Sequence, residues 1–196
     1  MTMKEKIKAG IMDAARIRRV LFRMATEILE RNRNLNNLVI VGIPTRGLPI
    51  AQRIARLIAE MEGVSIPVGP MDITGYRDDL PSGGERRSGP PEALPFSIAK
   101  KDIILVDDVL FTGRTIRAAM DSLFHQGRAA TIQLLVLIDR GHRELPIRAD
   151  YVGKVLPTSR REIVQVRLKE TDKIDEVLIT EASGLKVKGQ ARARKR

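Results

Sequence analysis

Runs of consecutive apolar residues alternate along this chain with segments in which apolar residues recur every three or four positions. The runs lie at 38–43, 103–106 and 132–138, the last of them interrupted only by Gln133, and the first two are followed by helical spacing over 48–61 and 115–126. A short apolar run predicts a strand buried on both faces, and a strand–loop–helix order predicts a parallel sheet. The pattern therefore predicts an α/β fold in which helices flank a mostly parallel central sheet.

A further helix is predicted near the N-terminus, where Asp13 can cap the first turn. Its apolar positions recur at helical spacing: Ile17, Val20, Leu21, Met24 and Ile28. Arg16, Arg19 and Arg23 project from other directions of the same helix. We therefore expect one face of this helix to pack and another to be basic.

The remaining segments are shorter or lack a core pattern. One or two strands are predicted within residues 64–76, and two more are predicted near 163–168 and 177–180. Residues 78–95 are dense in proline, glycine, serine and charge, which predicts a long loop. We interpret 77–95 as a lid over a binding site, and a plain linker is the alternative.

Length and composition fit one domain in a reducing compartment. The 196 residues suffice for a single core over 1–183, followed by a basic, disordered tail at 184–196. The absence of cysteine excludes disulfides and thiolate zinc sites, and two histidines leave little for a structural metal. No run has the length of a signal peptide core or a membrane span. We expect a cytoplasmic protein with no membrane partner.

The charge of the chain points to a larger partner. A formal net charge of +11 is high for an enzyme that binds only one small anion. Positive charge attracts the phosphates of nucleic acids. We therefore predict a nucleic acid partner, and the alternative is an arginine-rich, solvated surface of the kind found in thermophiles.

The candidate chemistry is concentrated in residues 103–115, which read IILVDDVLFTGRT. Asp107 and Asp108 follow the apolar run, and a loop with two threonines then leads into a helix. Such a loop at a helix N-terminus forms a nest for phosphate. The two carboxylates are placed to accept hydrogen bonds from a ribose whose 5′-phosphate fills the nest. A phosphorylated ribose is the predicted ligand, and the alternative is an ordinary buried strand with a solvated acidic turn.

This stretch resembles the phosphoribosyl pyrophosphate (PRPP) motif of type I phosphoribosyltransferases. A second loop, GIPTRG at 42–47, follows the first buried strand and is expected at the same sheet edge. The resemblance implies the type I phosphoribosyltransferase fold, with a non-proline cis peptide in this second loop. It implies that PRPP is bound by Thr45, Arg46, Gly47, Asp107, Asp108, Leu110, Phe111, Thr112, Gly113, Arg114 and Thr115. Pro44 departs from the family pattern and removes an N–H from the loop.

The implied reaction is displacement at the anomeric carbon of the ribose, with pyrophosphate as the leaving group. Asp107 and Asp108 would stabilise the positive ring of the transition state, and Arg46 and Arg77 would stabilise the departing anion. Magnesium would enter with PRPP as the cofactor. No side chain is assigned as a direct metal ligand.

From about residue 11 to 180 the chain resembles a narrower family, the pyrimidine operon regulators called PyrR. The resemblance is carried by ERN at 30–32, DITGYRDDL at 72–80, residues 139–154 and PTSR at 157–160. It implies a uracil phosphoribosyltransferase that makes UMP, and an RNA-binding regulator that acts on pyrimidine leader mRNA, as in transcription attenuation, with uridine nucleotide as the signal. It also implies a five-stranded sheet under a small hood, expected at 139–160, and a homodimer or higher homo-oligomer.

The same resemblance assigns the base and RNA contacts. Uracil would lie at Ile138, Asp139 and Arg140, where backbone groups read its edges. The RNA-binding residues would be Arg19, Arg23, Arg143, Arg148 and Lys154. Phe22 would stack on an unpaired base or belong to the core, and Glu144 would pair with the arginines beside it. An enzyme without RNA regulation and a nucleotide-sensing RNA-binding regulator without useful turnover remain as alternatives.

Overall fold

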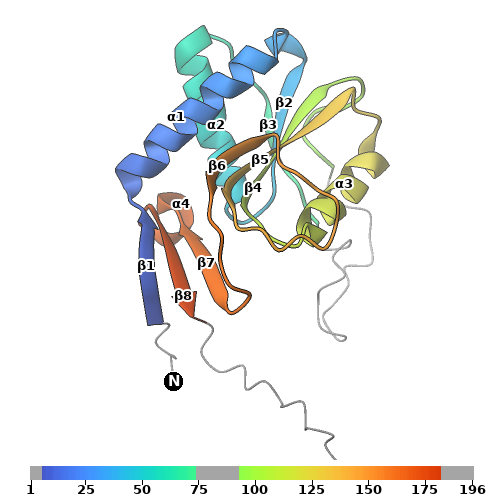
Figure 1. The fold of residues 1–196 in the computed structure, drawn as a ribbon. Helices are drawn as coiled ribbons and strands as arrows, with labels where there is room; N and C mark the ends of the chain where they lie inside the picture. The colour runs from blue at the N-terminus through green and yellow to red at the C-terminus, as the bar shows by residue number, and fades with distance from the viewer. Residues whose placement is uncertain (1–5, 74–92, 182–196) are drawn as a thin grey trace, which may run out of the picture.

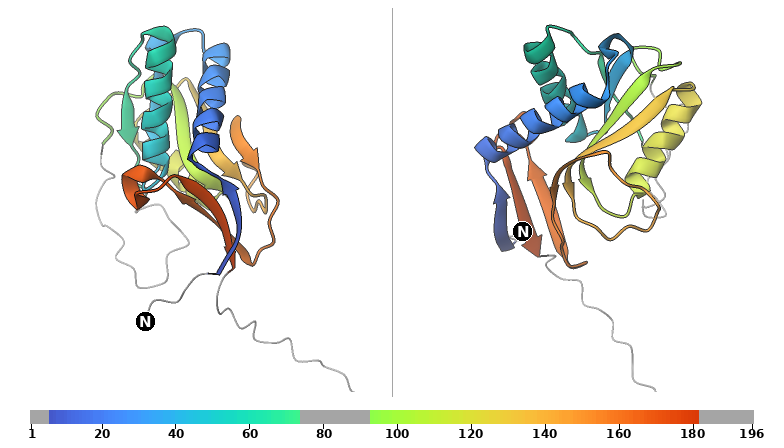
Figure 2. Two further views of the ribbon diagram at one scale, coloured as in Figure 1. Left: turned by 90° about the vertical axis from the view of Figure 1, so that its left-hand side faces the viewer. Right: turned by 45° about the horizontal axis from the view of Figure 1, so that its top comes forward.

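The computed structural model describes residues 6–73 and 93–181 (Figures 1 and 2). Within these ranges a five-stranded sheet has the order β3-β2-β4-β5-β6, and all neighbouring strands are parallel. The strands are β2 (Leu38–Gly42), β3 (Val68–Pro70), β4 (Asp102–Leu110), β5 (Thr131–Asp139) and β6 (Tyr151–Val155). The predicted α/β fold with a parallel central sheet is confirmed.

Helices cover both faces of this sheet. α1 (Ala14–Arg31) and α2 (Gly47–Glu62) pack side by side on one face, and α3 (Arg114–Gln126) packs on the other (Figure 2). Asp13 caps α1 as predicted, since its side chain accepts a hydrogen bond from the N–H of Arg16 at 2.7 Å. A 3-10 turn, η1 (Leu35–Asn37), leads into β2. This parallel order places the carboxyl ends of β2, β4 and β5 at one edge of the sheet.

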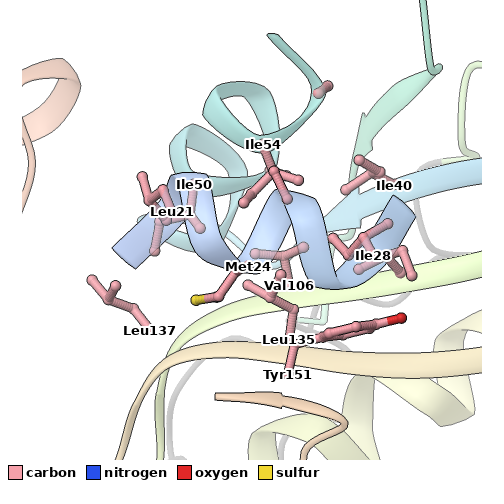
Figure 3. Packing of buried hydrophobic residues seen from close by; sticks show 14 of the residues in the cluster. Leu21, Met24, Ile28, Ile40, Ile50, Ile54, Val106, Leu135, Leu137 and Tyr151 are labelled. Carbon is pink, nitrogen blue, oxygen red and sulfur yellow. The ribbon is translucent and has the colours of Figure 1, made fainter. Parts of the chain in front are cut away.

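Side chains of the central strands point alternately into two apolar layers. Ile40 and Val106 face α1 and α2, whereas Val39 and Leu105 face α3. Figure 3 shows the first of these layers, in which Met24 of α1 is completely buried above the strands. Burial on both faces explains why these strands are continuous apolar runs rather than alternating patterns.

A second, antiparallel sheet stands beside the first (Figure 1). In the described part of the chain it has three strands in the order β1-β8-β7. They are β1 (Lys6–Met12), β7 (Glu162–Arg167) and β8 (Glu176–Glu181), and the short helix α4 (Lys169–Asp172) lies between β7 and β8 in the sequence. β1 was not predicted, because its burial pattern is mostly exposed and its partner β8 is remote in the sequence.

The structure corrects the predicted position of the hood. Within the expected range 139–160, β6 is the edge strand of the main sheet, parallel to β5. Tyr151 anchors it there, because its ring is completely buried and its hydroxyl donates to Gln133 and accepts from Asn32. The separate small sheet is built instead from β1, β7 and β8.

Two predicted segments lie largely outside the described residues. The basic tail at 184–196 does so entirely, and of the lid at 77–95 only residues 93–95 are described. There Leu94 is buried, and its N–H donates to Gln126 of α3 at 2.9 Å. That end of the predicted loop is therefore packed against the domain. Among the described helices, none is long and apolar enough to cross a membrane.

Candidate functional site

Asp107 and Asp108 lie at the carboxyl end of β4. Asp107 is only 6% exposed, and its Oδ1 accepts a hydrogen bond from the N–H of Asp108 at 2.9 Å. Oδ1 of Asp108 accepts in turn from the N–H of Val109 at 2.9 Å. Burial raises the pKa of Asp108, and hydrogen bonding with Asp107 and the positive charge of Arg46 oppose that rise. The backbone thus fixes two adjacent carboxylates at the edge where such sheets bind ligands.

The loop that follows β4 turns directly into α3. Gly113 occupies the N-cap position with φ of +93°, a left-handed conformation that favours glycine. Its carbonyl accepts the N–H of Arg117 at 2.9 Å, which starts the helical hydrogen bonding. The amino terminus of α3 therefore opens a few residues after the two aspartates. Unpaired N–H groups and the helix dipole make such an end a binding site for phosphate.

The second predicted loop, between β2 and α2, lies directly against β4. The N–H of Ile43 donates to the carbonyl of Val106 at 2.9 Å, and a Cβ on Gly47 would lie 2.4 Å from the same oxygen. Only glycine allows α2 to begin this close to β4. The peptide between Pro44 and Thr45 is cis, as the resemblance implied. The two loops predicted to bind PRPP are thus adjacent.

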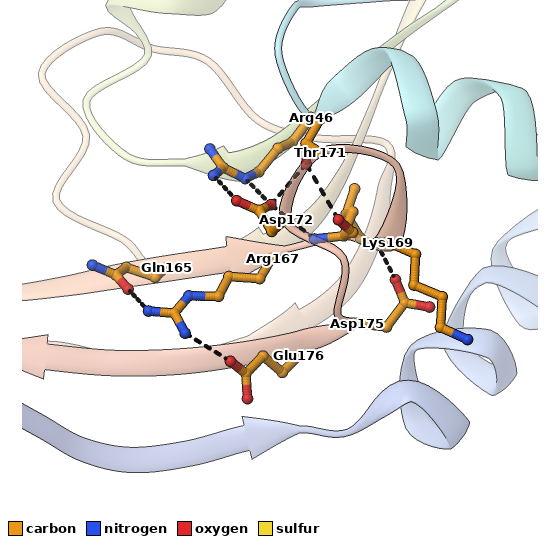
Figure 4. A network of polar contacts seen from close by, with 9 residues as sticks. Arg46, Gln165, Arg167, Lys169, Thr171, Asp172, Asp175 and Glu176 are labelled. Atoms are coloured by element: carbon orange, nitrogen blue, oxygen red, sulfur yellow. Dashed lines mark hydrogen bonds and ion pairs between the residues drawn. The ribbon is translucent and has the colours of Figure 1, made fainter.

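Arg46 of this loop is held by a carboxylate from α4 (Figure 4). Its Nε and Nη2 donate to the two oxygens of Asp172 at 3.1 and 2.8 Å. Asp172 also accepts from the hydroxyl of Thr171 at 2.7 Å and the N–H of Leu168 at 3.0 Å. The hydrogen bonds from Arg46 hold the pKa of Asp172 well below its usual range, and the same pairing raises the pKa of Arg46. The sequence did not indicate Asp172, which lies 126 positions further along the chain.

A polar cavity of about 340 Å³ separates this loop from β7. Its lining includes Arg46, Asp108, Gln165 and Arg167. Arg167 donates to Gln165 at 3.2 Å and to Glu176 at 3.0 Å, so its guanidinium is oriented from two sides (Figure 4). Sequence reasoning missed Gln165 and Arg167, because β7 was predicted only as a short strand. The cavity offers charged and amide groups to a polar ligand next to Asp108.

The residues predicted to contact uracil lie at the end of β5. Ile138 is completely buried, and Asp139 is half-buried. Arg140 is 7% exposed, and its guanidinium carbon lies 4.1 Å from the centroid of the Phe111 ring. It also donates to Thr158 at 3.1 Å and to two carbonyls of the following segment. The side chain of Arg140 is thus occupied within the protein.

The predicted RNA-binding residues lie in different environments. Arg19 and Arg148 are exposed, and Lys154 is half-buried. Arg23 donates to two carbonyls of β6, both at 2.9 Å, and so ties α1 to the edge strand. Arg143 is held by hydrogen bonds to its own segment and to the loop after β4. Arg19, Arg148 and Lys154 are accessible to a phosphate. Arg23 is also exposed but has backbone partners, and Arg143 is mostly enclosed by its partners.

The structure tests the predictions for Phe22 and Glu144 and leaves the prediction for Arg77 untested. Phe22 is 53% exposed on α1, so the alternative that it belongs to the core is wrong, and stacking on a base stays a prediction. Glu144 pairs with Nε of Arg114 at 2.8 Å, whereas the arginines of its own segment were expected. Arg77 lies outside the described residues. In the described ranges no group of three or more His, Cys, Asp or Glu is placed to hold a metal ion.

Comparison with known proteins agrees with this geometry. The phosphoribosyl transferase domain family matches residues 11–171. The chain belongs to this family. It is 54% identical over 179 residues to the protein named bifunctional protein PyrR of Thermus aquaticus, and the match covers 91% of this chain and 99% of that protein. A protein of the same name from Chloroflexus aurantiacus is 58% identical over 173 residues, or 88% and 95% of the two chains. Within the phosphoribosyltransferases, the chain is therefore a member of the PyrR proteins.

Solved structures support the same fold. A mutant of the hypoxanthine phosphoribosyltransferase from Trypanosoma cruzi has a TM-score of 0.71 at 19% identity, and the match covers 89% of this chain and 96% of that one. The enzyme named hypoxanthine phosphoribosyltransferase from Staphylococcus aureus gives 0.66 at 21% identity, with 88% and 92% covered. At these identities the likeness concerns the fold alone. It confirms the predicted type I phosphoribosyltransferase architecture.

Proposed function

We propose that this phosphoribosyltransferase converts uracil and PRPP into UMP and pyrophosphate, and that it binds the leader mRNA of pyrimidine biosynthetic genes under the control of uridine nucleotide. The observation that carries the enzymatic half is that the two loops predicted to bind PRPP lie side by side at one sheet edge, next to Asp107 and Asp108. The regulatory half is supported by the likeness to the bifunctional PyrR proteins and by the net charge of +11.

In the proposed reaction, the loop at 110–115 and the amino terminus of α3 hold the 5′-phosphate of the ribose. Asp107 and Asp108 accept hydrogen bonds from the ribose hydroxyls and stabilise the positive charge that develops on the ring. Arg46 stabilises the pyrophosphate as it leaves, and its bidentate pair with Asp172 fixes the plane of the guanidinium. Uracil lies at the end of β5, where the backbone of residues 138–140 reads its edges.

Magnesium is the proposed cofactor and enters with PRPP. Oxygen ligands are those that magnesium prefers, and the carboxylates of Asp107 and Asp108 at the crevice fit a magnesium-bound sugar phosphate. When bound, the ion neutralises charge on the leaving pyrophosphate. Both aspartates act through their negative charge and their hydrogen bonds, so each is needed in its ionised form.

The proposed RNA surface comprises the accessible basic residues Arg19, Arg148 and Lys154. We also propose that the protein acts in the cytoplasm as a homodimer or higher homo-oligomer. UMP at residues 138–140 would lie in the same segment of the chain as Arg148, eight positions before it. Nucleotide that orders this segment raises the affinity for RNA, and by linkage RNA raises the affinity for UMP by the same factor. Light scattering after size-exclusion chromatography measures the oligomeric state, and a monomer would contradict that part of the proposal.

Release of pyrophosphate from PRPP tests the enzyme. We expect release that requires uracil and magnesium, and little release when hypoxanthine replaces uracil. Titration of a leader stem-loop with and without UMP tests the regulator, with a scrambled RNA of equal length as the control. Turnover without selective RNA binding would leave an enzyme alone, and selective, UMP-dependent binding without turnover would leave a regulator that has kept the fold to sense nucleotide.

A further inference from the structure

The side chain of Arg143, which the resemblance assigned to RNA binding, is hydrogen-bonded within the protein. Its Nη1 donates to the carbonyls of Phe111 at 2.9 Å, Gly141 at 3.2 Å and Leu110 at 3.3 Å. Its Nε donates to the carbonyl of Ile147 at 3.0 Å. The side chain is 23% exposed, so its guanidinium is mostly withdrawn from solvent.

The remaining donor group of Arg143 is also occupied. Nη2 lies 2.5 Å from Oδ2 of Asp139, and Oδ1 of the same carboxylate accepts the N–H of Gly141 at 3.0 Å. Asp139 ends β5, and Leu110 ends β4. The guanidinium therefore bridges the carboxyl ends of two neighbouring strands and the loop that leaves one of them.

The backbone around Arg143 holds the same loop. The carbonyl of Thr112 accepts the N–H groups of Glu144 at 3.0 Å and Leu145 at 3.2 Å, and the carbonyl of Leu110 accepts the N–H of Arg140 at 3.1 Å. Together with Arg143, these contacts bind three successive carbonyls of the loop, at positions 110, 111 and 112, to residues 140–145.

The orientation of these carbonyls determines where the loop directs its donors. In a planar trans peptide, the C=O of one residue and the N–H of the next point in opposite directions. Holding the carbonyls at 110, 111 and 112 toward residues 140–145 therefore turns the N–H groups at 111, 112 and 113 away from that segment. These are the N–H groups that form the proposed phosphate nest at the start of α3.

We infer that Arg143 is a positioning residue of the phosphate nest: it sets the direction of the loop N–H groups and so the affinity for PRPP, without touching the substrate. This role rests on the proposed assignment of residues 110–115 to PRPP. It departs from the RNA contact that the resemblance implied, because every nitrogen of the guanidinium already has a partner in the protein. Lysine cannot replace it, since one ammonium cannot reach acceptors that lie around a planar fork.

The test compares Arg143→Lys and Arg143→Ala with the parent by calorimetric titration of magnesium-PRPP and by steady-state kinetics. The control is Arg161→Ala, which removes an equal charge from an exposed position just before β7. We expect the Kd and KM for PRPP to rise at least about tenfold in both Arg143 variants, a change of about 1.4 kcal/mol in binding, and to stay at the parental value in the control. The KM for uracil should change much less.

A purely structural role gives a different result. Partial unfolding would lower kcat in proportion to the folded fraction, measured by circular dichroism, while the Kd of the folded molecules stayed parental, and that result would overturn the inference. Parental Kd and KM in fully folded Arg143→Lys would overturn it as well. A parent protein that binds no PRPP would instead refute the assignment of the loop, and the role of Arg143 would fall with it.

Discussion

At the scale of single residues, the adjacent aspartates at the end of β4 carry the proposed electrostatic stabilisation. Replacing both with Asn keeps their shape and removes their charges. Turnover should fall at least about a hundredfold if each contributes roughly 2–3 kcal/mol in a closed site. Uracil-dependent release of pyrophosphate measures the effect. Asp121→Asn, which breaks only a surface pair with Arg117, is the control; a folded double variant with near-parental turnover would disprove the assignment.

The pair between Arg46 and Asp172 predicts a pH dependence of stability. Pairing with Arg46 lowers the pKa of Asp172 in the folded state. The ionised carboxylate therefore stabilises the folded protein at pH values above its unfolded pKa of about 3.9, and this stabilisation is lost as the pH falls toward the lowered pKa. Asp172→Asn should therefore be less stable than the parent at pH 7, and the difference should shrink as the pH drops below about 4. Urea unfolding at pH 7, 5 and 3 measures this. A difference that stays constant over that range would contradict the prediction.

At the scale of elements, the packing of α2 against β4 depends on Gly47. In Gly47→Ala the new methyl would lie 2.4 Å from the carbonyl oxygen of Val106, so the helix or the strand must shift. We expect a loss of about 1–3 kcal/mol, although alanine is the better helix former. Gly10→Ala in β1 is the matched control, since nothing lies within 4 Å of its new methyl, and its stability should change by about 0.5 kcal/mol or less. Equal effects of the two substitutions in urea unfolding would refute this account.

At the scale of the whole molecule, the positive charge should make RNA binding strongly dependent on salt. Each phosphate neutralised on a single-stranded region contributes about −0.7 to the slope of log affinity against log salt. Replacing Arg19, Arg148 and Lys154 with Ala should therefore flatten the slope by about 2, and Arg161→Ala should change it little. Titrations at several salt concentrations give the slopes. Equal slopes for the parent and the triple variant would remove these residues from the RNA surface.

The sequence by itself determined those parts of the protein that depend on neighbours in the chain. The apolar runs of β2, β4 and β5, and the helices α1, α2 and α3, follow from local periodicity, which requires no knowledge of distant contacts. The diaspartate loop was visible for the same reason, since strand, carboxylates, glycine and helix start follow one another directly. The resemblance to phosphoribosyltransferases rests on this contiguous stretch.

Only the tertiary structure decided the contacts that join remote segments. β1 pairs with β8 from the other end of the chain, and Asp172 reaches Arg46 across 126 positions. Arg23 and Arg143 look like surface charges in the sequence, yet both bind backbone carbonyls. Every residue has a carbonyl, so the sequence carries no signal for which of them will accept an arginine. The tertiary fold determines which carbonyls accept these hydrogen bonds, because it brings the strand ends and loops together.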